Sequence, residues 1–213
     1  ENNPDPKLGD PINTLRSWDL KTSTDAVAMT LAHFYGTNCL QWGRSIHRPD
    51  APSQMELFEN FDQWASQNQQ LSLFKKAVDR LVHDFGTWQM PWGEVNRYQR
   101  LNGDIRQAFD DQKPSVPIGF ASGRWGALAA YGARYHNNTK KIYGTRGNSF
   151  AAVVEFGDKV KAKSILAGGQ SGDPNSPHFN DQTDRYANQQ WKKVAYYKED
   201  ILKRAQRTYR PGK

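Results

Sequence analysis

Residues 147–182 read GNSFAAVVEFGDKVKAKSILAGGQSGDPNSPHFNDQ, and this stretch carries the clearest fold signal in the chain. Residues 149–156 (SFAAVVEF) and 159–166 (KVKAKSIL) flank Gly157-Asp158, which predicts a β-hairpin with a two-residue turn. Lysines at alternate positions of the second run predict one solvated face. Residues 151–154 are all apolar, so the first strand is expected to be covered on both faces, inside a layered sheet.

A glycine loop and two helices are expected after the hairpin. Residues 167–172 read AGGQSG, and Ser176 is followed by Pro177, a residue that favours the first position of a helix. We therefore expect Ser176 to cap a helix that continues over residues 178–190. A last helix is expected over residues 198–207.

The chain before the hairpin is expected to be mostly helical up to about residue 110. The clearest pattern is a wide apolar stripe over residues 71–85, which ends at Gly86. Three further helices are expected: one capped by Ser23 or Thr24 and ending near Gly36 and Asn38, one beginning near Ser53, and a short one over residues 101–109.

Helices, a hairpin and further helices in this order define an α+β fold rather than a doubly wound sheet. We divide the chain into three segments by their composition. Residues 1–11 are polar and proline-rich and are expected to be a linker or a processed end, and residues 12–112 are expected to be a mostly helical segment. Residues 113–213 are expected to contribute to a sheet through the hairpin at 149–166 and to carry C-terminal helices.

Composition argues against several classes of function. The 213 residues carry a formal net charge of +7, but the basic residues are scattered and no nucleic-acid-binding motif accompanies them, so no nucleic-acid partner is expected. No apolar run approaches the roughly 18–20 residues that a bilayer span requires, so no membrane partner is expected. Cys39 is the single cysteine, and we expect a buried thiol there. The histidines show no metal-ligand spacing, so neither a metal nor a cofactor is expected.

One catalytic arrangement can be drawn within the chain. Ser171 precedes His178 in sequence, and Asp181 could orient that histidine. Against this, the loop around Ser171 lacks the G-x-S-x-G spacing of a nucleophile elbow. An acidic residue near a helix start is also favoured by the helix dipole whatever its role. We therefore favour a structural role for these three residues.

The opening stretch and two earlier segments together resemble the penicillin acylase family, which includes acyl-homoserine-lactone acylases and aculeacin-type acylases. The matching features of residues 147–182 are a G-x-S-F strand, a glycine-turned hairpin, a G-Q-S-G loop and an S-P-H-F-x-D-Q segment. Residues 90–97 (MPWGEVNR) and 14–19 (TLRSWD) are similar to the family's P-W-G-E-V-x-R and L-x-x-W-D segments. The matches occur in family order, which makes their combination specific although each is weak alone.

The resemblance implies the C-terminal part of the large (β) chain of an N-terminal-nucleophile hydrolase, with an αββα sandwich fold. In such enzymes a precursor cuts itself, and the new N-terminal serine attacks the substrate amide with its own α-amino group as base. Residue 1 here is Glu1, which has no hydroxyl or thiol, and the family's nucleophile and oxyanion-hole donors belong to upstream segments. No catalytic residue is therefore carried over to this chain, which alone is expected to be inactive.

The residues that do carry over form a loop and a helix start, for which we expect a structural role. They are Gly169, Gln170, Ser171, Gly172, Ser176, His178, Asp181 and Gln182. Aromatic side chains could line an acyl pocket, but they more often fill a core. The candidates are Trp88, Trp92, Trp125 and Tyr131.

By resemblance, the expected activity is cleavage of the acyl amide bond of penicillins, acyl-homoserine lactones or related N-acyl compounds. The expected partners are the upstream segment of the same precursor, its small α chain and the N-acyl substrate, in the periplasm or outside the cell. The residues alone leave an alternative, a free-standing basic α+β module that binds an anionic partner without catalysis.

Overall fold

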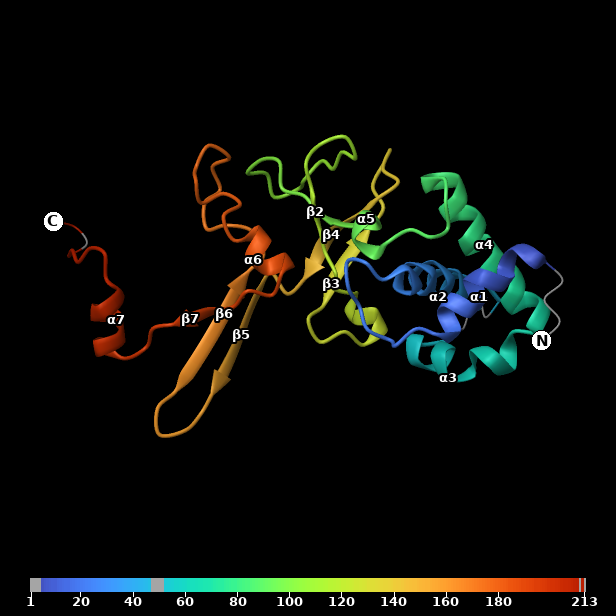
Figure 1. Cartoon of the computed structure of the whole chain (residues 1–213), viewed down its shortest axis with the longest axis horizontal. Coiled ribbons are helices and arrows are strands. Elements are labelled where there is room, and N and C mark those ends of the chain that lie inside the picture. Colours follow the sequence, from blue (N-terminus) through green and yellow to red (C-terminus); the bar gives the residue numbers. More distant parts are fainter. Residues whose placement is uncertain (1–4, 47–51, 211, 213) are drawn as a thin grey trace.

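The computed structural model describes residues 5–46, 52–210 and 212 and confirms the α+β class. Helices α1 to α4 lie together at one side of Figure 1, the sheet of β1 to β4 occupies the middle, and the second sheet lies beyond it, with its β5–β6 hairpin pointing away from the helices. The last helix, α7, lies beyond the second sheet, far from the helical part. Within this chain the two sheets do not stack as the layers of a sandwich, so the expected αββα sandwich stays a prediction for the wider fold.

The helical part contains a short turn of 3-10 helix and four α-helices. Their bounds are η1 Pro6–Leu8, α1 Gly9–Arg16, α2 Val27–Ile46, α3 Gln54–Trp64 and α4 Gln67–Phe85. Helices α2 and α4 pack against each other, and Leu31, Ala77 and Leu81 between them are fully buried. This cluster of apolar side chains is the main core of the molecule.

Helices α3 and α4 agree with the sequence patterns. Ser53 caps α3 in a capping box with Glu56, which satisfies two backbone donors at the helix start. Gly86 ends α4 in the left-handed conformation, with φ of 80°, which glycine adopts without strain. One residue of the expected apolar stripe differs: Val82 is 45% exposed.

Helix α2 is longer than expected and begins later, at Val27. It continues through Gly36 and Asn38, where an end was expected. Instead of ending the helix, both residues make contacts with other parts of the chain. A Cβ at Gly36 would lie 2.8 Å from the Trp125 ring, so glycine lets that ring pack on the helix. The Asn38 side chain donates to the Leu73 carbonyl of α4, 3.0 Å away.

The segment after α4 joins the helices to the first sheet. Helix α5 (Trp92–Val95) leads directly into β1 (Asn96–Tyr98), which pairs with β2 (Val116–Pro117) antiparallel and with β4 (Ile142–Gly147) in parallel. Strand β3 (Tyr131–Arg134) adds to β4, so the order is β2-β1-β4-β3. The 3-10 turn η2 (Gly123–Trp125) precedes β3. The first strand therefore precedes residue 113, and the division into segments at residue 112 stays a prediction.

The second sheet has the antiparallel order β5-β6-β7, with β5 at Phe150–Glu155, β6 at Lys161–Leu166 and β7 at Lys192–Val194. The predicted hairpin is present, but its connection is longer than the expected two residues because Glu155 and Lys161 are the last register partners. The part of the chain that the structure describes does not supply the expected cover, since Phe150 and Val153 are 61% and 60% exposed there. Ile165 of β6 is buried, so the sheet meets the core at the base of the hairpin.

Two expectations about helices were wrong. Residues 101–109 form a loop, because the Gln107 side chain accepts from the Leu101 backbone and donates to the Asn102 carbonyl in place of helical hydrogen bonds. The helix expected over 178–190 is reduced to α6 (Thr183–Ala187), since residues 173–182 form turns. Residues 6–11 fold into η1 and the start of α1, and residues 1–4 lie outside the described residues, so the linker or processed end expected over residues 1–11 stays a prediction. The last helix, α7, covers Lys198–Arg204.

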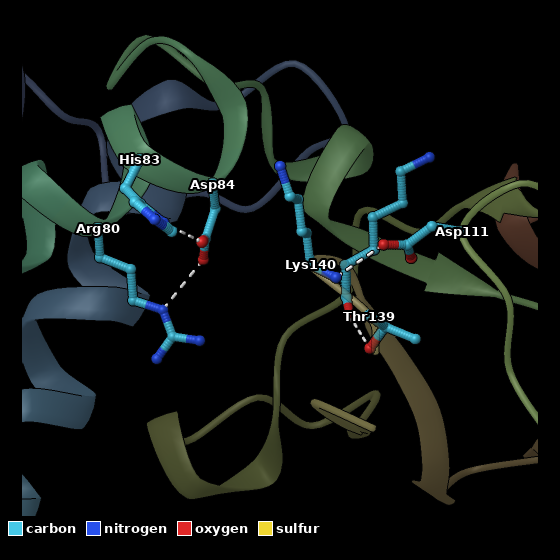
Figure 2. A network of polar contacts seen from close by, with 7 residues as sticks. Arg80, His83, Asp84, Asp111, Thr139 and Lys140 are labelled. Atoms are coloured by element: carbon cyan, nitrogen blue, oxygen red, sulfur yellow. Dashed lines mark hydrogen bonds and ion pairs between the residues drawn. The ribbon is translucent and has the colours of Figure 1, made fainter. Parts of the chain in front are cut away.

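Polar contacts fix the loop between β3 and β4. The Asp111 carboxylate accepts from the Lys140 backbone at 2.7 Å (Figure 2). The same carboxylate accepts from the Tyr143 hydroxyl at 2.8 Å, and the Thr139 hydroxyl donates to the His136 carbonyl, which closes the turn. Nearby, Arg80 and Asp84 at the end of α4 form an ion pair of 3.2 Å.

Among the described residues, no helix combines the length and hydropathy needed to cross a bilayer.

Leu81→Ala should test whether the α2–α4 contact supports the fold. Leu81 is fully buried, so we expect the free energy of unfolding to fall by about 2–5 kcal/mol. Urea denaturation measures this change. The adjacent Val82, which is 45% exposed, supplies the control, and Val82→Ala should cost less than about 1 kcal/mol. Equal losses for the two variants would contradict the observed helix orientation.

Candidate functional site

The glycine loop and the turns that follow it, residues 168–182, are held by one arginine. Arg100 lies in the loop after β1 and donates to two carbonyls of this segment, Phe179 at 2.6 Å and Ser171 at 2.9 Å. Its guanidinium also lies over the Phe179 ring, 4.1 Å from the centroid. In return, the Asn180 side chain donates to the Arg100 carbonyl at 3.1 Å. Arg100 thus connects two parts of the chain that lie far apart in sequence.

Glycines allow the chain to approach closely at this point. A Cβ on Gly169 would collide with the His178 carbonyl, and one on Gly168 would lie 2.6 Å from the Tyr98 hydroxyl oxygen. The Gln182 backbone donates to the Gly168 carbonyl at 2.8 Å, which ties the loop to the start of α6. Gly168 and Gly169 therefore have a packing reason to be glycine, whereas a Cβ on Gly172 would meet no atom within 4 Å.

Ser171, His178 and Asp181 lie near one another, but their contacts differ from those of a catalytic triad. His178 Nδ1 and Asp181 Oδ2 are 3.0 Å apart, and this contact holds the pKa of Asp181 below its ordinary value. The Ser171 hydroxyl accepts from the Asp173 backbone at 3.1 Å, while the Ser171 backbone N–H donates to the His178 carbonyl. His178 is 70% exposed, whereas the histidine of a triad works inside a cleft that limits water.

The remaining motif residues form turns. Ser176 Oγ accepts from the His178 backbone at 3.2 Å, so it stabilises a turn and does not cap the expected helix. Gln182 precedes α6, and its Oε1 is buried without a hydrogen-bond partner among the described residues. Gly172 approaches the neighbouring loop, since a Cβ on Gly103 would collide with the Gly172 carbonyl. Gln170 is exposed in the same loop. The structural role of these residues stays a prediction.

The hydrogen bonds from Arg100 to the 168–182 segment form a clamp, and the segment 90–97 positions it. Trp92 is fully buried and donates from Nε1 to the Phe120 carbonyl at 3.0 Å. Asn96 is also fully buried and donates to the carbonyls of Ile118 and Phe120. Arg97 holds the Ser115 carbonyl and hydroxyl. Arg100 lies a few residues after this motif. That position is the sequence feature that could have indicated a role for Arg100.

A cavity of about 790 Å³ lies beside the loop, between β1, the 99–109 loop and the β3–β4 pair. The buried rings of Tyr131 and Tyr186 contribute to its wall. Burial raises the pKa of both tyrosines, in the case of Tyr186 to about 12, so both hydroxyls are neutral at physiological pH. The Tyr131 hydroxyl donates to the Arg97 carbonyl at 2.8 Å, which links the cavity wall to β1.

A second, more apolar cavity of about 620 Å³ is lined by His33 and Trp125 together with residues 127–129. Desolvation, with a contribution from the Arg124 charge, lowers the pKa of His33 to about 4, so this histidine is neutral at pH 7. Its Nδ1 accepts from Trp125 Nε1 at 3.4 Å. Of the four candidate aromatic residues, two line a cavity, Trp125 and Tyr131, and two pack in or against the core, Trp92 and Trp88.

The chain offers little chemistry of its own in the part that the structure describes. No group of three or more His, Cys, Asp or Glu side chains there could hold a metal ion. Cys39 is half-buried beside Tyr35, and burial raises the pKa of its thiol to about 12. That thiol is therefore protonated and poorly nucleophilic at neutral pH.

The sequence model of the family described as Penicillin amidase matches residues 2–203. The match extends over nearly the whole chain, so this protein belongs to the penicillin amidase family. Membership makes it part of an acylase-like hydrolase of the N-terminal-nucleophile class.

Arg100→Leu should release the 168–182 segment. The substitution removes two charge-assisted hydrogen bonds to carbonyls, so we expect faster amide hydrogen exchange in this segment and a loss of about 2–4 kcal/mol of stability. Mass spectrometry resolves the exchange by segment. Arg106→Leu, in the same loop but exposed, is the control and should leave the exchange unchanged. Unchanged protection in Arg100→Leu would show that the clamp does not hold the loop.

His33 should make the protein sensitive to acid. Its folded pKa of about 4 lies below the ordinary value of 6.5, so the unfolded chain binds more protons between these values. The stabilisation is complete above pH 6.5 and is lost as pH falls toward 4. Between pH 7 and 4.5, His33→Gln should reduce the drop in unfolding free energy by about 2 kcal/mol, measured with urea.

The control for this pH experiment is His83→Gln, since the His83 side chain is 84% exposed. It should change the pH dependence by less than about 1 kcal/mol. If His33→Gln retains the full pH dependence of the parent protein, His33 is not the buried group that resists protonation.

Proposed function

We propose that this chain is the C-terminal part of an N-acyl amide hydrolase whose nucleophile is a serine upstream in the same precursor. The single observation that carries the proposal is the family match over residues 2–203. The proposed substrates are penicillins, acyl-homoserine lactones or related N-acyl compounds. In this reading the chain supplies part of the scaffold, and the serine with its own α-amino group supplies the reaction.

The chemistry of the proposed nucleophile needs few partners. An α-amino group has a pKa near 8, so about a tenth of it is unprotonated at pH 7 and can accept the serine proton. Attack forms an acyl-enzyme and releases the amine, and water then releases the carboxylic acid. The contacts of Ser171 favour an upstream nucleophile, since its hydroxyl accepts a backbone N–H and its neighbour His178 is open to solvent.

The proposed partner is the upstream segment of the precursor, together with the small α chain. The support comes from the hairpin. Strand β5 lies at the edge of its sheet, and Phe150, Val153 and Val154 on it are all well exposed. An apolar edge strand is a site for pairing with another strand, and a layered sheet would cover both its faces. We propose the periplasm or the cell exterior as the location.

The competing function is a basic binding module without catalysis, which the net charge of +7 alone would favour. The two proposals differ in one measurable respect. A binding module needs no further segment for its activity, whereas the hydrolase needs the serine-led part of the precursor.

Amide cleavage should require the upstream segment. We expect the purified chain to release no product from penicillin G, a long-chain acyl-homoserine lactone or a chromogenic anilide, because it lacks the nucleophile. The same assay with the chain co-expressed behind its preceding precursor sequence should show cleavage. Ser171→Ala in that complete form should keep most of its kcat, since Ser171 holds a turn.

Two outcomes would contradict the proposal. Cleavage by the isolated chain that disappears in Ser171→Ala would identify Ser171 as the nucleophile. A complete precursor that folds and contains this chain but cleaves none of the three substrate types would also contradict the proposal.

A further inference from the structure

We propose that the cavity of about 790 Å³ beside the 168–182 segment binds a small organic carboxylate that carries a ring or short apolar chain. The cavity is bounded by the 99–109 loop, the β3–β4 strands and Tyr186 of α6. Its volume is in the range of small-molecule sites. The proposal concerns binding alone, so it stands or falls independently of the proposed hydrolase activity.

The charges that line the cavity are mostly positive and mostly uncommitted. Arg106, Arg134 and Arg146 line it, and none of the three side chains makes an ion pair or hydrogen bond within the described part of the chain. Arg100 also lines it, but its guanidinium is used by two backbone carbonyls. Asp104 is the one carboxylate among the lining residues, and it accepts from Asn102. Three free guanidinium groups against one engaged carboxylate favour an anionic ligand.

A buried polar atom at the same site lacks a partner. His136 lines the cavity, and its Nε2 is buried with no hydrogen-bond partner among the described residues. Burial and the nearby Arg134 charge lower the pKa of this ring. Buried polar atoms are nearly always paired in native proteins, so an unpaired one at a cavity points to a ligand or water. A carboxylate there would favour the protonated ring and accept a hydrogen bond from it.

Aromatic rings form another part of the wall, and they favour an organic over an inorganic anion. Phe109 lies against the His136 ring, 4.3 Å between centroids, and stacks on Tyr143 at 4.9 Å. Tyr131 and Tyr186 add two further rings. Inorganic phosphate would leave these rings facing water, whereas a ligand with an apolar part would cover them. The geometry therefore favours an aryl or short alkyl carboxylate.

The probe for this site is 3-phenylpropionate, titrated into the 213-residue chain in low-salt buffer by calorimetry. We expect saturable binding tighter than about 1 mM and at least about tenfold weaker binding of the neutral isostere 3-phenylpropionamide. Inorganic phosphate should bind at least about tenfold more weakly than the probe. Arg134→Gln and Arg146→Gln should each weaken binding of the probe about tenfold or more. The His136 ring signals in NMR should shift on addition of the carboxylate.

The matched control is Arg44→Gln, which removes the same charge from an exposed position on α2 that does not line the cavity. It should leave the affinity unchanged, and thermal melting should show that all three variants fold. Equal weakening in Arg44→Gln would show a general effect of net charge and would overturn the site. Binding of the amide or of phosphate as tight as that of the carboxylate would overturn the ligand class. Absence of saturable binding would overturn the proposal as a whole.

Discussion

The helical part and the first sheet depend on the hydrogen bonds that Trp92 and Asn96 donate to residues 118–120. Both side chains are fully buried, and the Phe120 carbonyl accepts from both. Asn96 reaches the Ile118 carbonyl as well. These carbonyls belong to an irregular segment that has no complete strand partner, and a buried carbonyl without a donor is costly. The two side chains therefore replace the missing strand and allow an irregular segment to cross the core.

The same segment places everything that surrounds the glycine loop. Because α5 runs directly into β1, the position of Asn96 fixes the direction of the strand, and the strand delivers Tyr98 and Arg100 to the loop. Tyr98 meets Gly168, and Arg100 meets the turns beyond it. The segments 90–97 and 168–182, distant in sequence, thus form a single structural unit. The first segment orients Arg100, and Arg100 holds the second.

Sequence patterns predicted the regular elements better than the connections between them. The α4 stripe, the helix start near Ser53 and the hairpin strands depend on local spacing, and all three are present in the structure. Gly36 misled because a stop signal and a packing site for Trp125 look alike in sequence. Ser176-Pro177 misled for a similar reason, since serine favours turns as well as helix caps. The role of Arg100 required the distance between segments far apart in the chain, which no local pattern contains.

The parallel pairing of β1 with β4 has a consequence for the order in which the chain folds. Asn96 and Arg97 pair with Ile142 and Tyr143, so a long loop must close before this pairing contributes any stability. The contacts within the β5–β6 hairpin join segments that are closer in sequence, whereas α2 and α4 meet across a separation comparable to that of β1 and β4, for example between Asn38 and Leu73. Proteins dominated by distant pairings fold more slowly than those with local contacts. The β5–β6 hairpin is thus expected to form before the parallel pairing of β1 with β4, so β1 and β4 stay unpaired with each other for longer than the two hairpin strands.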